Sequence, residues 1–509
     1  MSPKDITYSE RRNIMKKLRR SLVLALAAAT VISAGSCGGG GRAETTAAEG
    51  SSADTAATTA APATTTNPLT NETDAAVQDA AANVEVDSEL KPTKKIKWLS
   101  WWDIDETSAE VELFKANYGI PEQGSKDYGE EFADRVFVYT SVPYADRYDV
   151  LGKLVASGDS PDIFEFEINY FPLSAYKAMF QSIDGVIDTY SDEWADTREA
   201  MDKFMWGGKN YTPIISEGLD SIWYYRRSVV QEAGLDDPYE LYKNGEWTWD
   251  KMLEMAEKFK TSGENKYLTD GWYVQRSIVG TTGVPVVGLE DGKLKSNLND
   301  PSIMRAMDVV SKFASQGYGY PKAENGWSLN YDWWASGNIL FMVDGEWAYQ
   351  NPIGGYAESN HWDEDEIFFV PAPRDPEADE YYQLFKTDPF MFCAGSDNVD
   401  GYKAWIKCNL IASKDPDIKA AAREKYKRDY NWTYEQLDFL DQLKHGDLKG
   451  VYDFRKGIST ECFVDDGTSP VDKIINEPYN SYDSVYYNLV AENEGAINTA
   501  IDKMNSSLS

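Results

Sequence analysis

Hydrophobic and polar positions follow two different periods in the stretch after Thr93. A period of two predicts strands, and apolar residues recurring about every three to four positions predict helices. Val136 and Val138 alternate in one expected strand, while Val111 and Phe114 share the inward face of one expected helix. The predicted elements are a strand over 96–101, a helix over 107–117, a strand over 135–142, a helix over 144–157 and a strand over 162–166. This order predicts βαβ units with parallel neighbouring strands.

Apolar periodicities farther along the chain predict more helices. Thr248 is the expected N-cap of a helix over 248–261, because its hydroxyl oxygen accepts a hydrogen bond from a free N–H of the first turn. Gly263 is expected to end this helix. Further helices are predicted over 301–315, 399–412 and 485–505.

The N-terminal region, 1–37, has the pattern of a secretion signal. Lysines and arginines between positions 16 and 20 precede an apolar run from Leu22 to Ile32, with Met15 as an alternative start. This run is shorter than the about 20 residues that a membrane-spanning helix needs. Small residues lead into Cys37, so we expect cleavage there and lipid modification of the cysteine. Ordinary secretion with an incidental cysteine is the alternative.

The composition changes abruptly near residue 93. Residues 38–92 are rich in Ala, Thr, Ser and acidic side chains and contain no aromatic residue. Such a segment buries too little apolar surface to offset the entropy lost on ordering, so we predict a disordered tether. All 16 Trp residues follow it. The remaining stretch, 93–509, exceeds the usual size of a single hydrophobic core, so two lobes are expected.

Charge restricts the partners of the chain. The net charge is −34, and residues 1–37 carry seven Lys or Arg against two Asp or Glu, which leaves −39 on the rest. A surface this acidic is poorly suited to nucleic acid, whose phosphates need neutralising by Lys and Arg. It is also repelled by an anionic membrane surface, so membrane attachment is expected to depend on the lipid.

Histidine and cysteine are scarce. His361 and His445 are too few for a histidine-based zinc site, and the cysteines show no metal-binding or disulfide spacing. We therefore expect neither a metal nor another cofactor. The 84 Asp and Glu residues guarantee candidate carboxylate pairs for glycoside hydrolysis, but no motif singles out one pair.

Four segments in order resemble extracellular solute-binding proteins of family 1, the sugar-type receptors of ABC importers. The first runs from Leu154 to Ile163 and reads LVASGDSPDI. The others are IWYYRRSVVQEAGL at 222–235 with WTWDKML at 247–253, then ASGNILFMVDGEWA at 335–348, then FVPAPR at 369–374. Arg226 departs from the family's usual Tyr-Tyr-Asn.

The resemblance implies an α/β fold with two lobes, the type II periplasmic-binding-protein-like fold, which closes on a ligand in the cleft between the lobes. One lobe is expected to contain 93–220 and about 391–430. The other is expected to contain about 222–385 and 431–509, with Phe385 to Ser396 as a crossing between them. Open α/β sheets bind ligands beyond the carboxyl ends of their strands, which agrees with this placement.

Sugars offer apolar C–H faces to aromatic rings and hydroxyl groups to carboxylates and amides. Trp347 matches the family's binding tryptophan, at the turn that follows a strand. Trp101 and Trp102 face opposite sides of the first strand, so one belongs to the core, and we favour Trp102 as the ligand residue. The expected ligand-binding set is Trp347, Trp102, Asp103, Glu167, Asn169, Tyr170 and Glu217. Trp272 and Tyr273 are weaker candidates, whereas Trp333 and Trp334 suit the core of an amphipathic helix better.

These features together predict a monomeric, lipid-anchored receptor on the outer face of the cytoplasmic membrane. Its expected ligand is a carbohydrate, favoured as an oligosaccharide by the number of aromatic residues, and its expected partner is the membrane permease of an ABC importer. A binding protein is expected, not an enzyme. A secreted glycoside hydrolase and a surface glycan receptor without a transport role are the alternatives.

Overall fold

The computed structural model describes residues 75–86, 89–104, 106–122, 128–166, 170–459 and 469–508. The expected signal over 1–37 with its lipidation site Cys37, most of the expected tether, and the candidates Glu167 and Asn169 lie outside these residues. Within the described part of the chain, no helix is both long and apolar enough to cross a membrane.

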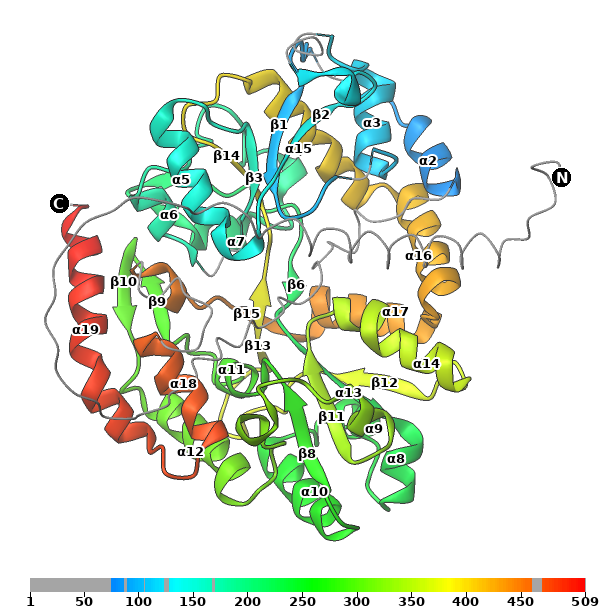
Figure 1. Ribbon diagram of the computed structural model, residues 1–509, viewed down its shortest axis with the longest axis vertical. Helices are drawn as coiled ribbons and strands as arrows, with labels where there is room; N and C mark the ends of the chain where they lie inside the picture. Colours follow the sequence, from blue (N-terminus) through cyan, green and yellow to red (C-terminus); the bar gives the residue numbers. More distant parts are fainter. Residues whose placement is uncertain are drawn as a thin grey trace, which may run out of the picture. The chain divides into compact units, whose positions relative to one another are not determined.

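The first sheet is built from strands that are close in sequence and one strand that returns from far away. It contains β1 (Ile96–Ser100), β2 (Phe137–Ser141), β3 (Ile163–Glu165) and β14 (Phe390–Phe392), in the order β14-β3-β1-β2. β1 pairs in parallel with β2 and β3, which confirms the predicted βαβ arrangement, and β14 is antiparallel to β3. Figure 1 shows helices flanking this sheet, among them α3 (Ala109–Tyr118), α5 (Arg147–Ser157) and α15 (Val399–Lys414).

Aromatic side chains attach these helices to the first sheet. Tyr148 of α5 packs on Phe164 of β3 with ring centroids 5.6 Å apart, and Trp405 of α15 packs on Phe137 of β2 at 4.8 Å. Shorter helices here are α6 (Leu173–Tyr176) and α7 (Arg198–Lys203), which is followed by the hairpin of β4 (Met205–Trp206) and β5 (Lys209–Asn210).

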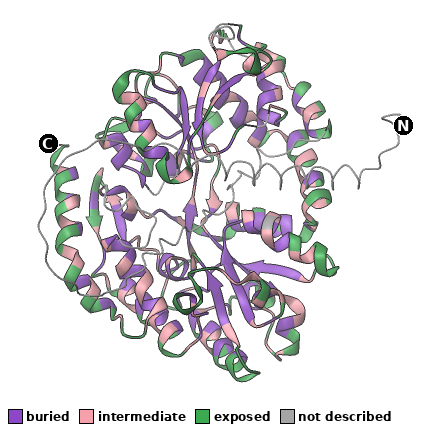
Figure 2. Cartoon of the chain, viewed as in Figure 1, coloured by how far each residue is buried: buried purple, intermediate pink, exposed green. Residues whose placement is uncertain are grey.

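The second sheet contains β7 (Ile222–Arg226), β8 (Tyr267–Gly271), β11 (Ile339–Asp344) and β12 (Ile367–Val370), in the order β12-β7-β11-β8. β11 runs parallel to β8 and antiparallel to β7, which in turn is antiparallel to β12. The carboxyl ends of β8, β11 and β12 therefore meet the start of β7 at one edge. β11 and β12 are buried along their whole length, as Figure 2 shows by colour.

The helices that accompany the second sheet come from the middle and the end of the chain. They are α8 (Arg227–Glu232), α9 (Pro238–Lys243), α10 (Trp249–Thr261), α11 (Val274–Gly280), α12 (Pro301–Ser315), α13 (Tyr331–Ala335), α14 (Gly354–Asn360), α17 (Tyr434–Gln442), α18 (Pro470–Asn480) and α19 (Tyr486–Ser506). A hairpin of β9 (Val287–Glu290) and β10 (Lys293–Ser296) packs against α19.

A third, three-stranded sheet links the chain segments that feed the other two. It contains β6 (Gly218–Leu219), β13 (Tyr382–Lys386) and β15 (Lys449–Val451), in the order β15-β13-β6, and we call it the connecting sheet. β6 continues into β7 of the second sheet, and β13 continues into β14 of the first. A π-helical turn, η7 (Leu443–Asp447), leads into β15.

The predicted helices farther along the chain are present. Thr248 caps α10 by accepting a hydrogen bond from the backbone N–H of Lys251 at 3.4 Å. That helix ends at Thr261 with Ser262 as its C-cap, so Gly263 is the first residue beyond the cap, where it does not adopt a positive φ. α12 has the predicted bounds, and α15 and α19 differ from their predicted bounds by one or two residues.

The tether prediction is wrong for the described residues between 75 and 92. They begin with a helix, α2 (Ala75–Ala82), which packs on α3 and on α16 (Pro416–Tyr430). Val77 and Ala81, one helical turn apart, are buried there. The Asn117 side chain then donates to the Val84 carbonyl and accepts from the Val86 N–H. A neighbouring surface supplies the apolar contacts that this stretch lacks by itself.

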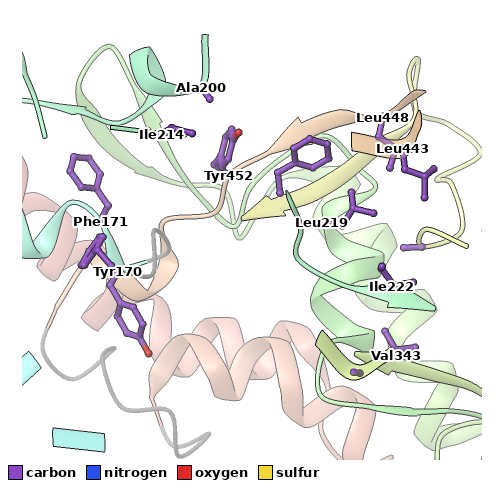
Figure 3. Packing of buried hydrophobic residues seen from close by; sticks show 14 of the residues in the cluster. Tyr170, Phe171, Ala200, Ile214, Leu219, Ile222, Val343, Leu443, Leu448 and Tyr452 are labelled. Atoms are coloured by element: carbon purple, nitrogen blue, oxygen red, sulfur yellow. The ribbon is translucent and has the colours of Figure 1, made fainter. Parts of the chain in front are cut away.

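The segment after β15 departs from the expected assignment of 431–509 to one lobe. The Phe204 ring lies 4.8 Å from Tyr452 and 5.3 Å from Phe454, centroid to centroid, and Phe454 also lies near Phe171. Figure 3 shows Tyr452 and Phe171 among the buried residues of this region. Aromatic packing therefore returns this short segment to residues of the predicted first lobe.

Candidate functional site

The strand ends of the second sheet carry a tightly fixed turn. Asp344, the last residue of β11, has no exposed surface. Its Oδ1 accepts the Gly345 N–H at 2.9 Å, and its Oδ2 accepts the Tyr331 hydroxyl at 2.6 Å. Burial raises the pKa of the Asp344 carboxyl to about 6, although both hydrogen bonds oppose the rise. Asp344 therefore holds the start of the turn in place.

Trp347 lies in this turn, as the sequence predicted. The buried Tyr224 hydroxyl donates to the carbonyl oxygens of Gly345 and Glu346 at 3.1 and 3.2 Å, which anchors the backbone from below. A Cβ atom at position 345 would lie 2.5 Å from Trp347 Nε1, so only glycine allows the indole to fold over the turn. The Trp347 ring is half-buried and retains exposed surface.

Trp272 follows the neighbouring strand end and is the more exposed ring, at 41 %. Gly271 before it has φ of 146°, and a Cβ atom there would clash with the Val343 carbonyl oxygen at 2.1 Å. The Lys322 ammonium lies 5.3 Å from the Trp272 ring and donates to the Gly271 carbonyl at 2.5 Å. The buried Lys322 ammonium thus contacts both the ring of the exposed Trp272 and the backbone just before it.

Arg276, Asp220 and Tyr273 form a third group near this edge. The Arg276 guanidinium pairs with both Asp220 oxygens at 2.7 and 3.0 Å and lies 3.8 Å over the Tyr273 ring. Burial raises the pKa of Tyr273, with Arg276 opposing the rise. Tyr273 is therefore covered by Arg276, whereas its neighbour Trp272 is open to solvent.

On the first sheet, the structure reverses the preference between Trp101 and Trp102. Trp102 is 5 % exposed, its indole N–H donates to Glu165 Oε2 at 2.8 Å, and its ring meets Trp98 edge-on. Trp101 is only half-buried and packs edge-on against Tyr144 at 5.1 Å. The expected alternation of the pair is correct, but Trp102 is the core member.

Two further candidates from the first lobe are already engaged within the protein. Asp103 forms a bidentate ion pair with Arg135 at 2.6 and 2.8 Å, although its own side chain is exposed. Tyr170 is 1 % exposed and packs on Tyr148 with centroids 5.0 Å apart, as Figure 3 shows for its position beside Phe171. Neither offers the free ring face or carboxylate that the sequence suggested.

Glu217 lies directly before β6 and is half-buried. Burial raises the pKa of its carboxyl to about 7, against the attraction of Lys203 and with the repulsion of Glu199. Among the residues that the structure describes, none donates a hydrogen bond to its carboxylate. It is therefore a carboxyl group with capacity for an external donor, where the chain enters the connecting sheet.

Trp334 is fully buried and donates its indole N–H to the Tyr224 carbonyl at 3.3 Å, which agrees with the expected core role. Trp333 packs between Tyr267 and Tyr320 and is half-buried. Trp327, which is 49 % exposed, was not among the candidates predicted from the sequence.

The sequence of the chain matches a known protein family. The model of the bacterial extracellular solute-binding protein family matches residues 104–408, more than half of the chain. The chain belongs to this family. The predicted membership is thereby confirmed, and it places the protein outside the cell or in the periplasm.

Solved structures show the fold of this solute-binding protein. The GacH receptor of Streptomyces glaucescens, solved unliganded and with acarbose, has a TM-score of 0.55 at 14 % identity, covering 80 % of this chain and 98 % of its own. The cyclic α-maltosyl-1,6-maltose binding protein of Arthrobacter globiformis has 0.53 at 14 %, covering 81 % and 99 %. An ABC transporter associated binding protein of B. animalis subsp. lactis, in complex with β-1,6-galactobiose, has 0.53 at 16 %, covering 81 % and 98 %. These structures confirm the predicted two-lobed α/β fold. No curated protein sequence matches the chain.

Ion pairs between residues far apart in the chain could not be predicted from the sequence of this solute-binding protein. Glu346 pairs with Lys444 at 2.6 Å, and the two residues are 98 positions apart in the chain. No local motif signals such a pair. Across the described residues there is no group of three or more His, Cys, Asp or Glu that could hold a metal ion.

Proposed function

We propose that this solute-binding protein is the receptor of an ABC importer and captures a carbohydrate, specifically an oligosaccharide, in a cleft between its lobes. The observation that carries the proposal is the pair of tryptophans, Trp272 and Trp347, that follow neighbouring parallel strands at one edge of the second sheet. Two ring platforms one strand apart suit a ligand of several sugar rings, since each ring stacks on one C–H face.

The charged groups nearby support a neutral ligand. Asp220 is paired with Arg276, and Glu346 is paired with Lys444, so neither carboxylate is left to clamp a cationic ligand. Glu217 has capacity to accept a sugar hydroxyl. The three solved structures named above carry carbohydrate ligands in their names, which favours the same ligand class here.

From the first lobe, we propose that Trp101 contributes a ring to the cleft, whereas the Asp103 carboxylate is held by its ion pair with Arg135. Glu167 and Asn169 stay proposals from the sequence as hydroxyl ligands. Trp102 and Tyr170 belong to the packing beneath this surface, because each is almost fully buried.

Binding and enzymatic turnover are separated by one experiment. The purified protein is screened by thermal shift against neutral mono- and oligosaccharides, including β-1,6-galactobiose, cyclic α-maltosyl-1,6-maltose and acarbose, and each sugar that stabilises it is recovered and analysed. We expect stabilisation with the sugar intact, since a ligand that binds only the folded state raises the melting temperature. No shift with any glycan would exclude a carbohydrate receptor.

A glycoside hydrolase is the second candidate, because the raised pKa of Glu217 is what a general acid needs near neutral pH. Recovery of cleaved sugar, abolished in Glu217→Gln, would establish it. Intact sugar with wild-type protein excludes it for that substrate.

We also propose that the chain is a monomer anchored through a lipid on Cys37 and delivers its ligand to a two-component permease. The proposal rests on the apolar run and the small residues before Cys37. Cys37→Ala should release the protein from the membrane into the medium, and mass spectrometry of the N-terminal peptide should find the lipid only in wild type. Light scattering of the purified protein tests the monomer, and co-purification with permease subunits tests the transport role.

A further inference from the structure

The Glu346 carboxylate bridges two chain segments that are far apart in sequence. Its Oε1 accepts the backbone N–H of Leu219 at 3.1 Å, and its Oε2 accepts the Lys444 ammonium at 2.6 Å. The side chains of Glu346 and Lys444 are only 10 % and 18 % exposed. Both oxygens of one shielded carboxylate are therefore committed to different segments.

These two segments lead to the two outer strands of the connecting sheet. Leu219 is in β6, which pairs with β13 on one side. Lys444 is in η7, which leads into β15, and β15 pairs with β13 on the other side. Figure 3 shows Leu219 together with Leu443 and Leu448, which flank this route. One carboxylate thus contacts one outer strand of the connecting sheet and the turn that leads into the other outer strand.

The backbone of Glu346 has little freedom of its own. The Tyr224 hydroxyl donates to the carbonyls of Gly345 and Glu346, and Asp344 accepts the Gly345 N–H. The next residue is Trp347, whose indole covers Gly345. A displacement of the Trp347 ring by a bound molecule therefore acts on a stiff turn whose Glu346 side chain reaches the connecting sheet.

We propose that Glu346 is a positioning residue that couples occupancy at Trp347 to movement of the connecting sheet, and so to closure of the lobes. The inference rests on the proposed function in one respect, since it takes the solute to lie on Trp347. Loss of either partner leaves a shielded charge without compensation, which weakens the turn, the sheet contact, or both. Coupling of this kind requires that the two sites share a two-state element, and the connecting sheet is that element here.

The chain supplies a matched control. Glu366 pairs with Arg226 at 2.8 Å with side-chain exposures of 13 % and 15 %, close to those of the Glu346 pair. Arg226 is the last residue of β7, and Glu366 directly precedes β12. This pair therefore lies within the second lobe, at the edge of the sheet away from Trp347. Glu366→Gln therefore removes an equally shielded carboxylate without touching the connecting sheet.

The first test needs no sugar. The full-length protein is labelled with 5-fluorotryptophan, and the Trp347 resonance is assigned with Trp347→Phe. Lys444→Met and Glu346→Gln are expected to shift or broaden that resonance, whereas Glu366→Gln leaves it in place. An unchanged Trp347 resonance in a folded Lys444→Met protein overturns the inference, and so does an equal change in Glu366→Gln.

The second test follows closure by small-angle scattering with β-1,6-galactobiose and acarbose as probes. We expect wild type and Glu366→Gln to contract at saturation, and Glu346→Gln and Lys444→Met to lose most of the contraction. Their Kd should rise about fivefold or more, and the double variant should be no weaker than the singles, because one bridge is lost in each. Full contraction in both single variants overturns the inference. If neither probe binds wild-type protein, the proposed ligand class fails for these sugars. The fluorine resonance of Trp347 then decides alone whether Glu346 couples the turn to the connecting sheet.

Discussion

Lys322 and Asp270 form an ion pair, 3.4 Å from Nζ to Oδ1, that is almost fully excluded from solvent: their side chains are 2 % and 0 % exposed. Asp270 Oδ2 also accepts the Asn330 N–H at 2.7 Å, and Lys322 lies under Trp272. Burial lowers the pKa of Lys322, and the Asp270 carboxylate opposes this by attracting the charged ammonium. The pair therefore connects the end of β8, just before Trp272, to the loop that contains Lys322 and the exposed Trp327.

Replacing Lys322 by Met should destabilise the protein strongly, because Asp270 would be left as an uncompensated buried charge. The expected loss is about 3–5 kcal/mol in the free energy of unfolding, measured by denaturant titration. Lys258→Met is the control: its pair with Glu254 is exposed, so the loss should stay under about 1 kcal/mol. Equal losses in the two variants would contradict the role assigned to the buried pair.

Trp347→Ala should weaken sugar binding by at least about tenfold, or about 1.4 kcal/mol, and Trp272→Ala should weaken it in the same direction. Each substitution removes an aromatic face on which a sugar ring can stack, from the half-buried Trp347 in one variant and from the exposed Trp272 in the other. Isothermal titration with the sugars that stabilise the wild type measures the effect. Tyr482→Ala removes a ring that is 74 % exposed between α18 and α19, and it should bind like wild type. Unchanged affinity in Trp347→Ala would remove this residue from the site.

The two neighbouring tryptophans of the first lobe should respond differently. Trp102→Phe loses the hydrogen bond to the buried Glu165 carboxylate, so it should lower the free energy of unfolding by about 1–3 kcal/mol. Trp101→Ala should instead reduce sugar affinity, with a smaller effect on stability. Denaturant titration and calorimetry on both variants check the assignment. The opposite pattern would restore Trp102 as the ligand residue.

Glu217 predicts a pH dependence of stability with a definite sign. Because burial raises its pKa in the folded protein from 4.5 to about 7, folding favours the protonated form. The contribution is fully present below the unfolded pKa of 4.5 and is lost as pH rises through about 7. Glu217→Gln should therefore gain stability over wild type between those values, at most about 3 kcal/mol. A difference between the two proteins that stays constant from pH 5 to pH 8 would contradict a buried Glu217.

The helix α2 predicts where a stable chain must begin. A chain that starts at Ala75 keeps the buried contacts of Val77 and Ala81, whereas one that starts at Lys94 loses them. The shorter chain should unfold more easily by about 1–3 kcal/mol, at about 0.8 kcal/mol per buried CH₂ group. Thermal melting of the two chains measures this difference. Equal melting temperatures would mean that residues 75–92 do not stabilise the fold and belong to the tether, as the sequence predicted.

Local pattern predicted most of the secondary structure near the site. The strands and helices of the first βαβ units, the Thr248 cap and the bounds of α12 followed from periodicity and capping chemistry, which depend on residues only a few positions apart. The turn that carries Trp347 was placed correctly for the same reason, because a glycine turn after an apolar strand has a local signature. Arg226, the departure from the family pattern, pairs with Glu366 across two strands of one sheet.

The sequence by itself determined the alternation of elements, the family and the positions of the aromatic residues relative to strand ends. Only the tertiary structure decided that Trp102 and not Trp101 is buried, that Asp103 is paired with Arg135, and that α2 packs on the fold. It also brought Glu346 to Lys444. Periodicity states which face of an element is buried but not what covers it, and whether a side chain remains free depends on partners that the folded chain brings from tens of residues away.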